Sequence, residues 1–273
     1  MALLHLNFPS QYLGGNTDVN IILPDRPRSQ SPQAFYGSGK KYPVLWLLHG
    51  TCGDYSDWVR KTNIELYACE KELVVVMPSA QNTDYADWDG FGLGYRMFSY
   101  LTEELMPLIY SWLPVSDRRE DNFISGDSMG GRGTIIYAFA HPEKFAAAYV
   151  MSCCPQDMRE GIHDTSWDNR NAKRLANTGG LEGYLASVQN TWDKTAELAG
   201  CGKLPKFYFA CGTKDDLMYE NFKKFRAYAD QAGFAAEYTE VEGYGHEWRF
   251  WELCIQDALE KFLPGTDKMG SSF

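Results

Sequence analysis

Short, continuously apolar runs that alternate with helix-like stretches constrain the fold of this chain more than any other feature. The runs VLWLL (44–48), LVVVM (73–77) and FYFAC (207–211) contain no alternation of polar and apolar residues. Strands have this composition when both faces of their sheet are covered, as in parallel sheets. We therefore expect an α/β fold with a mostly parallel central sheet and helices on both faces.

The same reading along the whole chain predicts about eight strands and five helices. The strands are expected at residues 4–8, 19–23, 44–48, 73–77, 122–125, 147–152, 207–211 and 236–241. The helices are expected at residues 63–71, 97–112, 129–140, 219–232 and 247–262. The first two strands, joined by the turn-like PSQYLGGNTD, are expected to form an antiparallel hairpin at one edge of the sheet.

One stretch interrupts this alternation. Residues 155–205 are polar, contain Gly and Asn, and show only weak helical patterns. We expect them to form an insertion above the carboxyl edge of the sheet, a cap or lid over the site, whose mobility the pattern leaves open. With 273 residues, the chain suits one large domain, residues 1–273.

Composition excludes several classes of function. The net charge of −10, without any basic run, argues against nucleic acid as a partner. The start MALLHLNFPS lacks the basic region of a signal peptide, and no apolar run is long enough for a membrane span. Seven cysteines without a C-x-x-C pair indicate free thiols and a cytoplasmic protein, and no spacing suggests a metal site. The sequence does not decide whether the chain forms a homo-oligomer.

Four glycines surround Ser128 in FISGDSMGGRG (123–133). GDSMG matches G-x-S-x-G, the nucleophile elbow, in which a strained strand-to-helix turn exposes the serine hydroxyl. Gly126 and Gly130 are then required because a Cβ would collide with the neighbouring strand and helix, while Gly131 and Gly133 let the helix lie close to the sheet. The pattern alone also fits a tight glycine-rich turn, so its interpretation depends on the partners of the serine.

A nucleophilic serine needs a histidine base and an acid that orients it, each after a later strand. Of the histidines, only His246, in GYGHEW, follows the last predicted strand and opens the last helix. His5, His49, His141 and His163 lie in the first strand, before the elbow, at the end of the elbow helix and in the insertion. We therefore expect His246 to be the base.

The acid is expected in GTKDD, directly after the strand at 207–211. Asp215 and Asp216 are both candidates, and either could instead cap the helix that starts near Tyr219. We favour Asp215 because a Gly-x-x-Asp turn places its side chain immediately after the strand end.

An oxyanion hole requires two backbone N–H groups. One is expected from Met129, the residue after the nucleophile, and the other from the loop HGTCGDYSDW, which follows the strand at 44–48. We choose Thr51 as this second donor, with Cys52 as the alternative. His49 is then a structural member of the loop.

Several segments together resemble the esterase D-like family, which includes tributyrin, feruloyl and acetyl esterases and S-formylglutathione hydrolases. They are LLHGTCGDYSDWVRKTNIE, VVVMPSAQ, DRREDNFISGDSMGGRG, CGTKDDLMYENFKKF and GYGHEW, in the same order and spacing. The resemblance covers nearly the whole chain, is weakest at residues 155–205, and is strongest toward the tributyrin and feruloyl esterase branch. It implies an α/β-hydrolase fold, no cofactor, and a Ser128–Asp215–His246 triad. The chain departs from the family at Asp127, a carboxylate beside the nucleophile that would either raise the pKa of an adjacent imidazole or need a partner such as Arg132.

These observations favour a serine carboxylesterase that hydrolyses short-chain acyl, acetyl or feruloyl esters through an acyl-enzyme. Trp88 is a candidate for binding an aromatic acyl group, although a packed loop tryptophan explains it as well. A thioesterase of the S-formylglutathione hydrolase type is an alternative, because esters and thioesters share the same tetrahedral intermediate. A third hypothesis, from another class, is an inactive hydrolase-fold binding protein.

Overall fold

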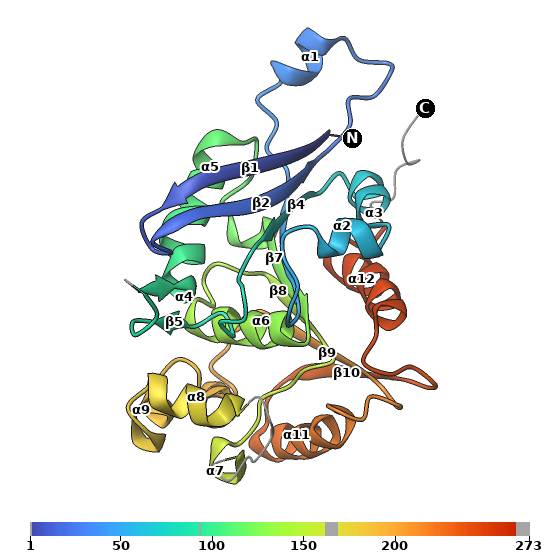
Figure 1. The fold of residues 1–273 in the computed structure, drawn as a ribbon. Helices are drawn as coiled ribbons and strands as arrows, with labels where there is room; N and C mark the ends of the chain where they lie inside the picture. The colour runs from blue at the N-terminus through green and yellow to red at the C-terminus, as the bar shows by residue number, and fades with distance from the viewer. Residues whose placement is uncertain (1, 93, 162–168, 266–273) are drawn as a thin grey trace.

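An eight-stranded sheet forms the centre of the computed structural model, which describes residues 2–92, 94–161 and 169–265 (Figure 1). The strand order is β1-β2-β4-β3-β7-β8-β9-β10. The six strands from β4 to β10 in this order pair in parallel, whereas β2 is antiparallel to both β1 and β4. The mostly parallel sheet and the antiparallel hairpin at its edge are both confirmed.

The strands of the central sheet are β1 (Ala2–Ser10), β2 (Gly15–Leu23), β3 (Val44–Leu48), β4 (Val74–Pro78), β7 (Asn122–Asp127), β8 (Ala147–Met151), β9 (Lys206–Gly212) and β10 (Ala236–Val241). The helices are α1 (Pro32–Tyr36), α2 (Asp57–Lys61), α3 (Ile64–Glu70), α4 (Met97–Ser99), α5 (Met106–Trp112), α6 (Met129–Ala140), α7 (Met158–Gly161), α8 (Arg170–Asn177), α9 (Leu181–Ala186), α10 (Thr191–Leu198), α11 (Tyr219–Ala232) and α12 (Trp248–Phe262). A small separate hairpin consists of β5 (Asp87–Trp88) and β6 (Tyr95–Arg96).

Two hydrophobic clusters bury the two faces of the sheet. One cluster joins the strands to α2, α3 and α12, with Trp58, Ile64 and Trp251 among its members. The other joins them to α4, α5, α6 and α11. Every residue of β3 and β4 is buried, as expected for strands covered on both sides. The helices on both faces are therefore confirmed (Figure 1).

Three features differ from the sequence prediction. The single helix expected at residues 97–112 consists of α4, a π-helical segment (Tyr100–Leu105) and α5. Pro107 follows the π segment closely, and it has no amide hydrogen for a regular α-helical ladder. The helices α1 and α2 and the β5–β6 hairpin are short elements without a strong hydrophobic period, and they were not predicted.

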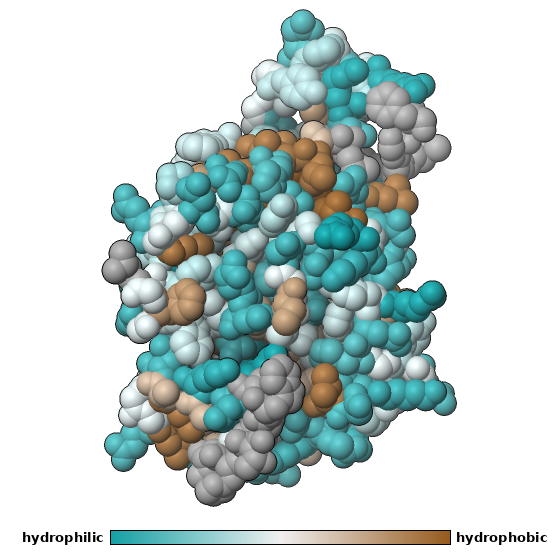
Figure 2. Space-filling view, viewed as in Figure 1, coloured by the Kyte–Doolittle hydropathy of each residue, from teal (hydrophilic) through white to brown (hydrophobic). Residues whose placement is uncertain are grey.

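No helix within the described ranges has the length and apolar character needed to cross a membrane. Hydrophilic residues cover most of the face drawn in Figure 2, and apolar colour is limited to small areas, one of them near β1. Leu3 and Leu4 of this edge strand are exposed.

Candidate active site

Ser128 lies in a strained turn between β7 and α6. Its backbone angles are φ 50° and ψ −113°, a left-handed conformation that a non-glycine residue rarely adopts. The strand before it ends at Asp127 and the helix after it begins at Met129, so no loop residue other than Ser128 separates the two elements. This is the geometry of a nucleophile elbow.

The glycines around the serine allow this close approach. A Cβ on Gly126 would lie 2.6 Å from the carbonyl carbon of Gly130, and one on Gly130 would lie 2.3 Å from the Leu48 carbonyl oxygen in β3. These distances are too short for any side chain, so both positions require glycine. Gly133 was expected to let α6 lie close to the sheet. A Cβ at this position would instead lie 2.6 Å from the Tyr85 ring, so Gly133 makes room for this ring.

Ser128, His246 and Asp215 form one continuous hydrogen-bonded chain. His246 Nε2 lies 2.9 Å from Ser128 Oγ, and His246 Nδ1 lies 2.9 Å from Asp215 Oδ2. The three residues follow β7, β10 and β9, whose carboxyl ends meet at one edge of the sheet. Asp215 is buried, whereas its neighbour Asp216 is exposed.

Asp215 is kept ionised by its hydrogen bonds. Burial alone would raise the pKa of Asp215, but the hydrogen bond and charge of His246, with further hydrogen bonds from Ser152 and Met218, hold it below its ordinary value. The Trp251 indole Nε1 donates to Ser152 Oγ at 3.1 Å, and the Trp251 ring meets the His246 ring edge-on with centroids 5.2 Å apart. Ser152 and Trp251 therefore fix the orientation of the acid and the histidine.

Sequence reasoning missed Ser152 and Trp251. Ser152 directly follows β8, at the same sheet edge as the other site residues, and its φ of 47° is again left-handed. This position at the end of β8 could have identified Ser152 as a site residue from sequence, because polar residues at the carboxyl ends of parallel strands converge on one site. Trp251 lies in the first turn of the amphipathic helix α12, where nothing in the local sequence distinguishes it from a core residue.

Thr51 and Met129 line one cavity of about 300 Å³ beside the serine. The amide of the alternative donor, Cys52, is engaged with Asn82 Oδ1 at 2.8 Å. No hydrogen bond among the described residues uses the Thr51 amide. Trp88 also lines this cavity, and its indole N–H donates to the Thr83 carbonyl at 2.7 Å.

Among the described residues, no histidine other than His246 makes a hydrogen bond to Ser128. His49 is buried, donates from Nδ1 to the Gly50 carbonyl at 2.7 Å and accepts from the Ala80 amide at 2.9 Å, so it fastens the loop. Burial lowers the pKa of His49, which keeps it neutral. His5 lies in β1 and His141 ends α6, whereas His163 lies outside the described residues.

Helix α8, from the predicted insertion, contacts the loops beside the serine. Arg170 donates to Thr51 Oγ1 at 3.0 Å. Arg174 donates twice to the Asp84 carboxylate, at 2.6 and 3.0 Å, and this ion pair is largely buried. Burial would raise the pKa of Asp84, but the charge and hydrogen bonds of Arg174 hold it below the ordinary value. Residues 162–168 of the predicted insertion lie outside the described residues.

Asp127, the unusual elbow residue, is not paired with Arg132 as the sequence suggested. Its carboxyl group is buried against Gly50, and neither oxygen has a partner of ordinary hydrogen-bond geometry among the described residues. Burial raises the pKa of Asp127 to about 8, and the nearby backbone groups of Asp127 and Gly50 offset only part of this effect. Asp127 is therefore a neutral carboxylic acid at neutral pH.

We predict that Asp127→Asn removes a pH-dependent loss of stability. The folded-state pKa lies above the ordinary value of 3.8, so between these values the folded state keeps a proton that the unfolded state has lost. The free energy of unfolding must then fall as pH rises from 4 to 8, by as much as about 5 kcal/mol from this group. Urea denaturation at pH 5 and pH 8 should show a smaller decrease for Asp127→Asn than for wild type. The exposed Asp216→Asn is the control, and parallel profiles for wild type and Asp127→Asn would refute the prediction.

A serine in a nucleophile elbow, linked to His and Asp at the carboxyl edge of a mostly parallel eight-stranded sheet, defines a serine hydrolase of the α/β-hydrolase class. The family model described as “Putative esterase” matches residues 10–262, and the chain belongs to this esterase family. It is a carboxylic ester hydrolase. The sequence-based predictions of the esterase family, the fold and the enzyme class are confirmed.

Individual relatives agree with this assignment. An acetyl esterase from Caldicellulosiruptor saccharolyticus is 28% identical over 281 residues, which cover 98% of this chain and 100% of the relative. The crystal structure of the S-formylglutathione hydrolase FrmB from Staphylococcus aureus is 28% identical, with a TM-score of 0.80 over 96% of this chain and 98% of that one. The ferulic acid esterase AmCE1/Fae1A from Anaeromyces mucronatus, at 18% identity and a TM-score of 0.64 over 95% of this chain and 89% of that one, shares the fold.

Proposed function

We propose that this esterase hydrolyses short-chain acyl esters, acetyl esters above all, through an acyl-enzyme on Ser128. The observation that carries the proposal is the hydrogen-bonded chain from Ser128 Oγ through His246 to Asp215, with both contacts at 2.9 Å. The acetyl esterase relative, which aligns over its whole length, supports an acetyl substrate.

Each residue has a defined role in the proposed reaction. His246 Nε2 takes the proton of Ser128 Oγ as this oxygen forms a bond to the ester carbonyl carbon. The Met129 and Thr51 amides hold the negatively charged oxygen of the tetrahedral intermediate. The intermediate collapses, the bond to the alkoxy oxygen breaks, and His246 gives its proton to the leaving alcohol. Asp215 accepts the hydrogen bond from Nδ1–H and stabilises the imidazolium.

Hydrolysis of the acyl-enzyme repeats these steps with water. His246 deprotonates the water as its oxygen bonds to the acyl carbon, and the bond to Ser128 Oγ then breaks and Oγ recovers the proton. The engagement of the Cys52 amide by Asn82 supports Thr51 as the second oxyanion donor.

The surroundings of the oxyanion cavity support a short acyl group. Arg170, Lys173 and Asp84 line this cavity beside Trp88 and Met129, and its volume is about 300 Å³. A long aliphatic chain would have to displace water from these charged groups without replacing their interactions. An acetyl group does not extend that far.

The insertion is proposed to cap the site. Contacts of α8 with Thr51 and Asp84 support a cap fixed to the loops beside Ser128. The cysteines are all free thiols, which supports the cytoplasm as the compartment.

A thioester substrate is the second candidate. The similarity to an S-formylglutathione hydrolase over 96% of this chain favours it, and the proposed steps apply to a thioester without change. The two candidates differ in the leaving group alone.

A panel of substrates tests the proposed function. We predict that p-nitrophenyl acetate is hydrolysed with a kcat/KM at least about 10-fold above that of p-nitrophenyl octanoate. Methylene groups of the octanoyl chain that do not fit the cavity would weaken binding of the transition state. Butyrate, methyl ferulate and S-formylglutathione complete the panel. A preference for octanoate would overturn the short-chain proposal, and a much higher kcat/KM for S-formylglutathione would favour the second candidate.

A further inference from the structure

A second cavity, of about 400 Å³, adjoins a different face of α8 from the oxyanion cavity. Arg170 and Lys173 of α8 line the oxyanion cavity, whereas Asn171 and Arg174 line the second one. Both cavities also touch the first turn of α6, one through Met129 and the other through Arg132. Met129 and Arg132, which both follow the nucleophile in the first turn of α6, therefore line different cavities.

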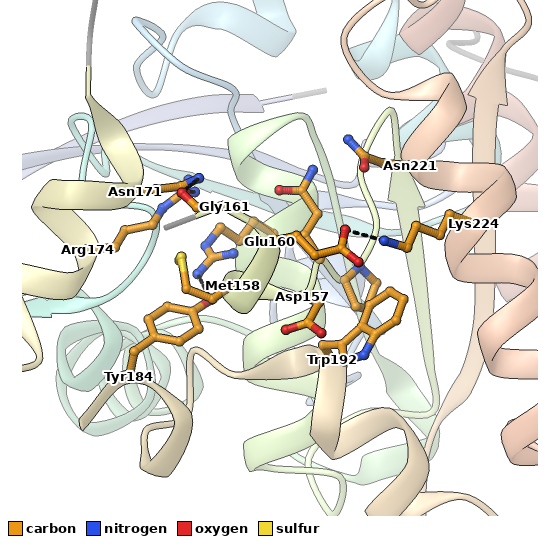
Figure 3. A pocket seen from close by; sticks show the side chains of 13 residues that line it. Asp157, Met158, Glu160, Gly161, Asn171, Arg174, Tyr184, Trp192, Asn221 and Lys224 are labelled. Atoms are coloured by element: carbon orange, nitrogen blue, oxygen red, sulfur yellow. Dashed lines mark hydrogen bonds and ion pairs between the residues drawn. The ribbon is translucent and has the colours of Figure 1, made fainter. Parts of the chain in front are cut away.

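Among the described residues, every charged side chain that lines the second cavity except Arg132 has an oppositely charged partner. Glu160 pairs with Lys224, as the dashed line in Figure 3 marks. Asp157 pairs with Arg159 at 3.0 Å, and Arg174 makes its two bonds to Asp84. Figure 3 places Arg174 and Tyr184 on one side of the cavity and Lys224 on the other.

Arg132 makes no hydrogen bond or ion pair with a carboxylate among the described residues. Its Nη2 donates to the Tyr184 hydroxyl at 3.0 Å, and its buried Nε has no partner among the described residues. The Asp84 carboxylate interacts electrostatically with Arg132, but it accepts its hydrogen bonds from Arg174. A partly buried guanidinium without a carboxylate partner loses hydration that nothing replaces, and its planar donors fit a carboxylate from outside the chain.

The position of Arg132 relates this charge to the reaction. Its amide donates to the Ser128 carbonyl at 3.1 Å, so its backbone lies about one helical turn beyond the nucleophile, about 6 Å along α6. With the acyl group and oxyanion in the cavity of Thr51 and Met129, the inference places the other half of an ester in the second cavity, beside Arg132.

We propose that Arg132 binds a carboxylate on the leaving-group half of the substrate, so that the preferred substrates are acyl esters of hydroxy acids. The inference rests on the proposed function, because it assumes an acyl-enzyme on Ser128. A rigid pair of substrates tests it: 4-acetoxybenzoate, which carries a carboxylate on the leaving alcohol, and its neutral methyl ester.

The measured quantity is the ratio of kcat/KM for 4-acetoxybenzoate to that for the methyl ester. Arg132→Gln should lower this ratio about 30-fold, as expected for loss of a charged hydrogen-bonded pair, and Arg132→Lys should restore part of it because lysine keeps the charge without the planar donors. Lys224→Gln, at the same cavity but paired with Glu160, is the matched control and should change the ratio less than 3-fold.

The possible outcomes separate the inference from the proposed function. If wild type cleaves the methyl ester and the ratio is unchanged in Arg132→Gln, the carboxylate subsite is wrong while the esterase proposal stands. If neither ester is cleaved, calorimetric binding of 4-hydroxybenzoate decides the inference. Wild type should then bind this carboxylate at least 10-fold more tightly than folded Arg132→Gln does, and equal affinity would overturn the proposal.

Discussion

Replacing Ser128 by alanine is expected to lower kcat/KM for p-nitrophenyl acetate by about 10⁴- to 10⁶-fold, because no other group can form the acyl-enzyme. His246 and the two amides would still bind substrate, so the loss should lie in kcat far more than in KM. Stopped or continuous assays of p-nitrophenol release measure both constants.

Ser125→Ala is the matched control for this prediction. Ser125 lies three residues earlier in β7, is buried, and donates to the Tyr149 carbonyl at 2.8 Å. Its loss should reduce stability by about 1 kcal/mol and leave kcat/KM within about 3-fold of wild type. A Ser128→Ala enzyme with more than a tenth of wild-type activity would contradict the proposed nucleophile.

The second large effect is expected for Asp215→Asn, with a loss of about 10³- to 10⁴-fold in kcat. An amide NH₂ facing His246 Nδ1 cannot accept its proton, so the ring would present the wrong tautomer to Ser128. The hydrogen bonds from Ser152 and Met218, which favour an ionised carboxylate, would also lose their charged acceptor.

Asp216→Asn gives this prediction a control that differs by one position. Asp216 is exposed, whereas the buried Asp215 contacts His246 at 2.9 Å. We expect Asp216→Asn to stay within about 3-fold of wild type. A crippled Asp216 variant beside an active Asp215 variant would show that the acid has been misassigned.

The sheet was predictable because its strands carry their own signal. Runs such as VLWLL and LVVVM are apolar on both faces, and only a covered parallel sheet buries all of them. The nucleophile elbow was equally predictable from sequence. Its turn leaves no room for a Cβ at Gly126 and Gly130, so the glycines appear at fixed positions beside Ser128. Placing His246 required only the order of strands along the chain.

The remaining features depend on contacts between distant residues. Helix α8 is held by the Arg174–Asp84 pair, 90 residues apart, and a helix of eight residues has little stability of its own. The Trp251–Ser152 hydrogen bond joins residues 99 apart. Asp127 was recognised as unusual, but whether it would find a partner or stay protonated depends on the packing of Gly50 against it. Local patterns do not contain this information.

Covalent trapping tests the central claim, that Ser128 is the nucleophile, most directly. The enzyme would be treated with a fluorophosphonate, digested with trypsin and analysed by fragmentation mass spectrometry of residues 120–132, a peptide that contains both Ser125 and Ser128. We predict one phosphonyl group per chain, on Ser128, with labelling abolished in Ser128→Ala and slowed at least 100-fold in His246→Ala. Stoichiometric labelling of another residue, or no labelling of an enzyme that still hydrolyses esters, would contradict the account.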